Sequence, residues 1–189
     1  MAPVQNPKVL VVAFEGDEEG LKFARADKSV YANYYRYVEG LKAHSLVTLQ
    51  GTIEEIKPDL LHLVVDVNDE GLLVDPEKNQ MPLASIVDYA VKQGGSYVIM
   101  AKNITQEALG QANSNFPKPF QANLMYTIDR KGRNFNSFLS KLFQRISKGE
   151  ALGISYVDLN PLDNKEHPNL PDTLLLLGAP KVVLMQDKL

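Results

Sequence analysis

Two charged side chains stand directly after two apolar segments of this sequence. The segment Asp59–Asp66 (DLLHLVVD) contains five leucines and valines and ends in Asp66, and Tyr97–Ala101 (YVIMA) is followed by Lys102 and Asn103. A short apolar run that ends at polar residues is typical of a strand buried on both faces. A carboxylate and an amine brought together can move a proton or form an ion pair.

Strands buried on both faces need helices on both sides, so the two segments predict central strands of an α/β sheet. In such sheets, functional groups lie beyond the carboxyl ends of the central strands. We therefore predict that Asp66 and Lys102 meet at one edge of the sheet as an ion pair, with His62 and Asn103 as neighbouring cleft residues. A lone histidine inside an apolar run, such as His62, is more often a core residue than a catalytic one.

Strands and helices alternate through the rest of the chain, with no internal repeat. The strongest helix is Asn134–Lys148, in which Phe135, Phe138, Leu142 and other apolar residues recur at helical spacing. The other expected helices are 28–43, with Asp27 as N-cap and its tyrosine hydroxyls in water, then 52–57, 83–92, 105–111 and 150–159. The other expected strands are 8–14, 45–50, 72–74, 122–128, 173–177 and 182–185, and residues 15–27 and 160–171 are expected to be loops.

Composition excludes several kinds of chemistry. The chain has 189 residues, 44% of them hydrophobic, which predicts one domain over 1–189 with an extended arm at 1–7. It has no cysteine, so it has no disulfide, thiolate metal ligand or cysteine nucleophile. A net charge of −3 without a basic cluster argues against nucleic acid. No apolar run approaches the ~20 residues that cross a bilayer, so we expect a cytoplasmic protein without membrane contact or cofactor.

The segment after the first central strand has acidic residues spaced as in a calcium-binding loop. Asp66, Asn68, Glu70 and Glu77 occupy positions of an EF-hand register, with Gly71 at the sharp turn. The preceding segment is β-like, however, and a proline follows at the position where the exiting helix should begin. An ordinary acidic turn is therefore the favoured interpretation, with calcium as the weaker alternative.

Short motifs are similar to those of a known superfamily. The chain reads LHLVVDV over Leu61–Val67 and IMAKN over Ile99–Asn103, and later has the segments Phe138–Gly153 and Leu176–Pro180. Residues 45–186 resemble the caspase-like superfamily, most closely its CHAT branch, in which an LHLxxHG strand carries the general base and an LSACN strand carries the nucleophile. The resemblance implies a three-layer α/β/α fold with a mostly parallel sheet of about six strands.

The dyad of that family is replaced in this chain. The resemblance places Asp66 where the family has histidine and Lys102 where it has cysteine. A peptidase of this type needs a thiolate to attack the carbonyl and an imidazole to move protons. The first expectation is therefore a catalytically inactive domain that acts as an interaction or regulatory module with a protein partner.

Two alternatives stay open. In the first, Asp66 and Lys102 act as an acid–base pair on a small substrate, which needs a lysine of depressed pKa that a neighbouring aspartate opposes. In the second, the chain is a flavodoxin-like binder of small molecules. The segment after the expected strand 8–14 reads EGDEEG, and its carboxylates would repel phosphate.

Overall fold

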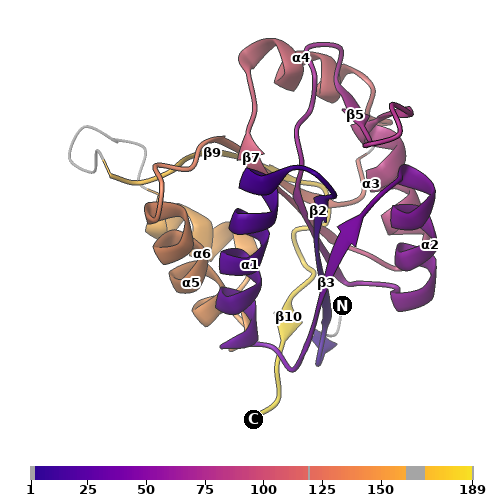
Figure 1. The fold of residues 1–189 in the computed structure, drawn as a ribbon. Coiled ribbons are helices and arrows are strands. Elements are labelled where there is room, and N and C mark those ends of the chain that lie inside the picture. Colours follow the sequence, from indigo (N-terminus) through magenta and orange to yellow (C-terminus); the bar gives the residue numbers. More distant parts are fainter. Residues whose placement is uncertain (1–2, 119, 161–168, 189) are drawn as a thin grey trace.

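The central element is a six-stranded sheet that lies between two layers of helices (Figure 1). The computed structural model describes residues 3–118, 120–160 and 169–188. The strand order is β3-β2-β4-β7-β8-β9, with all neighbours parallel except β8 and β9. The strands are β3 Tyr37–Ala43, β2 Lys8–Phe14, β4 Leu60–Val64, β7 Tyr97–Asn103, β8 Asn123–Asp129 and β9 Asp172–Leu177. The predicted three-layer α/β/α class with a mostly parallel sheet is confirmed.

One face of the sheet carries α1 Glu18–Ala32, α5 Asn134–Ile146 and α6 Leu152–Leu159, which Figure 1 shows together on its left. The other face carries α2 Leu46–Ile56, α3 Leu83–Lys92 and α4 Gln106–Ser114. Apolar side chains from both helix layers pack on the sheet, and every residue of β4 is buried. This two-sided burial explains why β4 is continuously apolar.

Two small sheets complete the fold. The parallel pair β1 Val4–Gln5 and β10 Leu184–Met185 joins the two ends of the chain at the side opposite α4 (Figure 1). The antiparallel hairpin β5 Leu72–Val74 and β6 Gln80–Pro82 follows β4 and lies beside the carboxyl ends of the central strands. None of the described helices is both long and apolar enough to cross a membrane.

Three predicted elements in the first third of the chain are wrong. Most of the expected loop 15–27 and the first residues of the expected helix 28–43 form α1, and the end of that helix is instead strand β3. The expected strand 45–50 is helical and is continuous with the expected helix 52–57, so the two form one helix, α2. Ser45 caps it through a hydrogen bond from the Thr48 amide at 3.1 Å, and Leu46, Leu49 and Ile53 form its buried stripe.

The later elements agree better with the sequence. Helix α3 has the predicted bounds, and α5 buries the predicted stripe that includes Phe138 and Leu142. Strands β7, β8 and β9 and helices α4 and α6 lie where the patterns placed them, within a few residues. The expected loop 160–171 falls largely on 161–168, which lie outside the described residues.

Candidate functional site

A cleft opens where the carboxyl ends of β2 and β4 meet the hairpin β5–β6. It has a volume of about 360 Å³, and we name it the strand-end cleft. This is the point at which the strand order reverses, because β2 has β3 on one side and β4 on the other. Its lining residues are Phe14, Glu15, Gly16, Asp17, Asp66, Asn68, Val74, Asp75, Pro76 and Lys78.

The predicted ion pair between Asp66 and Lys102 is present at this edge. The Lys102 Nζ lies 3.0 Å from Asp66 Oδ2 and 2.9 Å from Asp17 Oδ2, so it bridges two carboxylates. The exposed fraction of the side chain is 9% for Lys102, 25% for Asp17 and 73% for Asp66. Asp17 is therefore the more buried partner, and sequence analysis missed it.

The charge of Lys102 follows from these contacts. Burial alone would lower the pKa of its amine, but the hydrogen bonds and charges of Asp17 and Asp66 outweigh burial and raise the pKa above its ordinary value. Lys102 is thus held as an ammonium at neutral pH. An ammonium group has no lone pair for nucleophilic attack or for accepting a proton.

Asp17 joins the cleft to helix α1. Its Oδ1 accepts a hydrogen bond from the Gly20 amide at 3.0 Å, which makes it the N-cap of α1, and its Oδ2 binds Lys102. A Cβ at position 20 would collide with the Asp17 carboxylate and lie 3.0 Å from the Val64 carbonyl oxygen, so glycine is required there. An aspartate just after a strand and three residues before this glycine was the available signal for Asp17.

Asp75 lines the strand-end cleft, but both of its carboxylate oxygens already accept hydrogen bonds. This buried carboxylate accepts hydrogen bonds from the amides of Leu46 and Asn79, both at 2.8 Å. Burial would raise its pKa, but these amide bonds lower it further than burial raises it. Asp75 therefore anchors the hairpin to the start of α2. Both Asp17 oxygens are also bonded, so the carboxylates left to meet a ligand are those of Glu15 and Asp66.

The calcium candidate is not assembled as a site. Asp66 is turned to Lys102, and the Asn68 Oδ1 accepts hydrogen bonds from the Glu70 and Leu72 amides, both at 3.0 Å. The loop therefore uses its own oxygens for an Asx turn. In the part of the chain that the structure describes, no group of three or more histidine, aspartate or glutamate residues could hold a metal ion.

His62 and Asn103 do not line the strand-end cleft, contrary to the expectation for both. His62 is fully buried beneath α1 and α5, where its Nε2 lies 2.8 Å from Asp27 Oδ2 and its Nδ1 lies 2.7 Å from the Tyr31 hydroxyl. Asn103 lies at the end of β7, and its Oδ1 accepts the Arg130 amide at 2.9 Å. The alternation of side chains along a strand explains the position of His62, which lies on the other side of the sheet from its neighbours Leu61 and Leu63.

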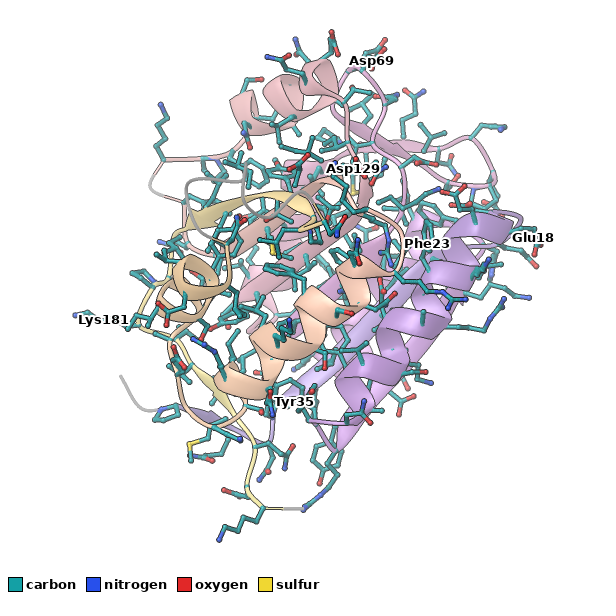
Figure 2. All side chains as sticks on the ribbon, turned by 90° about the vertical axis from the view of Figure 1, so that its left-hand side faces the viewer. Glu18, Phe23, Tyr35, Asp69, Asp129 and Lys181 are labelled. Atoms are coloured by element: carbon teal, nitrogen blue, oxygen red, sulfur yellow. The ribbon has the colours of Figure 1, made fainter. Side chains whose placement is uncertain are left out.

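His62 is one member of a buried polar network that sequence analysis did not find. Asp27 accepts two hydrogen bonds from Arg130, both at 2.9 Å, and one from Asn136 at 2.7 Å. The Arg130 guanidinium lies 4.1 Å from the ring centroids of both Phe23 and Phe135. In Figure 2, helices α1 and α5 run side by side, with Phe23 between their adjacent ends.

This network is a structural clamp. Asp27, His62 and Tyr31 have no exposed surface and Arg130 has 3%, so a substrate has no access to them. Burial would raise the pKa of Asp27, but its bonds to Arg130 and His62 lower it below its ordinary value. Asp27 was predicted to cap a helix, yet it lies within α1. The clamp fixes α1 and α5 to β4, and α1 in turn presents Asp17 to the cleft.

The comparisons with known proteins add the following. No protein-family model matches the chain, and no curated protein matches it. Among solved structures, it is similar to an alanine–glyoxylate aminotransferase from Nostoc sp., with 13% identity and a TM-score of 0.39. That match covers 70% of this chain and 32% of the other, so this chain spans about a third of that structure's length. A likeness at this level carries no argument about function.

Proposed function

We propose that this chain is a non-catalytic, caspase-like domain that binds a protein partner at the strand-end cleft. The observation that carries the proposal is the position of Lys102. It lies where the resemblance places the nucleophile, and it is held between Asp17 and Asp66 at 2.9 and 3.0 Å. A paired ammonium at this position supports a binding role and opposes a peptidase role.

The position of His62 supports the same conclusion. A peptidase dyad needs an imidazole within reach of the reacting atoms. His62, the imidazole on the strand that leads to Asp66, is fully buried and bonded to Asp27 and Tyr31. The chain therefore offers neither a thiol nor an accessible imidazole from this strand.

The electrostatics of the cleft favour a basic segment of the partner. Glu15 and Asp66 are exposed, and only one Asp66 oxygen is bonded to Lys102. Both Asp17 oxygens are already bonded, to Lys102 and to the Gly20 amide, and Lys78 is the one cation among the lining residues. An arginine or lysine side chain in the cleft would meet the carboxylates of Glu15 and Asp66, so its charge would be paired.

Binding of a small cationic molecule is the second candidate. If the strands of the six-stranded sheet are numbered along the chain, the first five have the spatial order 2-1-3-4-5. This is a doubly wound order, and proteins with it bind ligands where the strand order reverses. The acidic residues after β2 oppose a phosphate-bearing ligand. The acid–base alternative for Asp66 and Lys102 has less support, because the pKa of Lys102 is raised. The cytoplasmic location stays a prediction.

Peptides that differ only in one central residue test the proposal. We expect peptides with central arginine or lysine to bind, those with alanine or glutamate not to bind, and none to be cleaved. The double variant Glu15→Gln/Asp66→Asn should weaken binding by about tenfold, whereas Asp88→Asn, which changes a half-exposed carboxylate on α3, should not. Cleavage that is lost in Lys102→Ala, or binding without preference for a basic residue, contradicts the proposal.

A further inference from the structure

Strand β3 forms one edge of the main sheet. All seven of its residues pair with β2, from Lys8 opposite Tyr37 to Phe14 opposite Ala43. No described strand pairs with its outer side. An unpaired edge presents a row of amide and carbonyl groups that can bind one more extended strand.

A hollow lies beside this edge, next to Gly40 in the middle of β3. Gly40 pairs with Val11, and Val11 packs under α1, so position 40 faces α1. The Lys28 side chain lies over Gly40, and a Cβ there would be 3.3 Å from Lys28 Cδ. The hollow has a volume of about 250 Å³. Its apolar lining comes from Val11, Leu21, Ala24 and Leu41. We name this hollow, together with the outer side of β3, the β3 groove.

Three cationic residues complete the groove. Arg25 and Lys28 come from α1 and Lys42 from β3, and the groove has no acidic lining residue. None of the three forms an ion pair with a described residue. Glu39 does not neutralise them, because its strand partner Leu10 packs on the opposite face of the sheet.

We propose that the β3 groove binds an extended acidic segment of a partner protein, which adds to the sheet as a further strand. Backbone hydrogen bonds to β3 would hold the segment, and an aspartate or glutamate side chain would reach over Gly40 to Lys28 and Lys42. Charge complementarity selects this occupant: a second copy paired through β3 would bring two sets of these cations together. The groove shares no lining residue with the strand-end cleft, so this inference is independent of the proposed function.

A labelled peptide of about eight residues that alternates glutamate and valine is the probe, because alternation directs its acids to one face. We expect anisotropy to show binding that weakens by about tenfold or more in Lys28→Glu/Lys42→Glu. The matched control is Lys141→Glu, an exposed lysine on α5, which should retain the affinity. Gly40→Val should also weaken binding, because its side chain would displace Lys28 and enter the hollow. Urea melts of each variant establish that it is folded.

Two further measurements distinguish a groove that binds by strand pairing from a surface that binds any polyanion. The same peptide with alternate N-methyl groups, which cannot pair with a strand edge, should not bind. Amide NMR shifts on addition of the unmodified peptide should centre on 37–43. Absence of binding, equal loss in Lys141→Glu, unchanged affinity of the N-methylated peptide, or equal competition by single-stranded DNA would each overturn the proposal.

Discussion

Arg130 and Asp27 are 103 residues apart in the sequence and form a buried two-bond ion pair, with both hydrogen bonds at 2.9 Å. Each partner alone would leave a charge without compensation in the interior. Asp27→Ala should therefore lower the free energy of unfolding by about 3–5 kcal/mol. Urea denaturation measures this loss, with Asp88→Ala, a half-exposed aspartate on α3, as a control that should stay within about 0.5 kcal/mol. A loss for Asp27→Ala no larger than the control would mean that the clamp is not formed.

The same pair predicts a dependence of stability on pH. The folded pKa of Asp27 is lowered, so its contribution is present above the unfolded value of about 3.9 and is lost as pH falls through the lower folded value. The stability difference between wild type and Asp27→Asn should therefore be constant from about pH 7 to about pH 5 and shrink below about pH 4. Urea midpoints of both proteins across this pH range show whether the stability difference shrinks on acidification. A difference that grows on acidification would be inconsistent with a lowered pKa.

Helix α5 provides a prediction about packing. Phe138 is 3% exposed, and Lys141 lies on the outer face of the same helix. Phe138→Ala should cost about 3–5 kcal/mol through lost transfer energy and a cavity, whereas Lys141→Ala should change stability by less than about 0.5 kcal/mol. Comparable urea midpoints for the two variants would show that the buried stripe is misassigned.

The two carboxylates on Lys102 should contribute unequally. Asp66 is 73% exposed, so a double-mutant cycle between Asp66→Asn and Lys102→Met should give a coupling of only about 0.2–1 kcal/mol. Asp17 is less exposed and also caps α1, so Asp17→Ala should cost more than Asp66→Ala, by about 1 kcal/mol for the lost cap. Thermal unfolding of the two alanine variants ranks them, and the reverse order would contradict this assignment.

Sequence patterns located the elements whose burial is uniform. Strands β2, β4 and β7 are buried along nearly their whole length, and their apolar runs predicted them. The stripes of α3 and α5 predicted those helices for the same reason. The meeting of Asp66 and Lys102 followed from the rule that neighbouring parallel strands end at one edge.

Most of helix α1 was missed because two of its three buried positions are not apolar. Gly20 and Asp27 face the interior along with Tyr31, so no apolar period marks the helix. Asp27 is stable there only because Arg130 and His62 approach it from distant parts of the chain. A local pattern contains no information about such partners. The predicted position of the tyrosine hydroxyls was wrong for the same reason, since Tyr31 is buried against His62.

The predictions for the regions of strand β3 and helix α2 failed for different physical reasons. Most β3 side chains are not buried, because the strand is at the sheet edge, so it shows no alternation that a core would impose. Helix α2 begins with Leu46, Val47 and Thr48, and β-branched residues are typical of strands. Packing against the sheet and the Ser45 cap outweighed that propensity.

The charge state of Lys102 is the central claim of this account, and an NMR titration of its side-chain Nζ measures it directly. With Asp17 and Asp66 at 2.9 and 3.0 Å, the resonance should remain that of an ammonium from about pH 6 to about pH 10. In Asp17→Asn/Asp66→Asn the midpoint should move to lower pH, because burial then acts without the carboxylates. A wild-type midpoint between about pH 7 and about pH 9 would mean that Lys102 can act as a base or nucleophile and would contradict the proposal that the domain is non-catalytic.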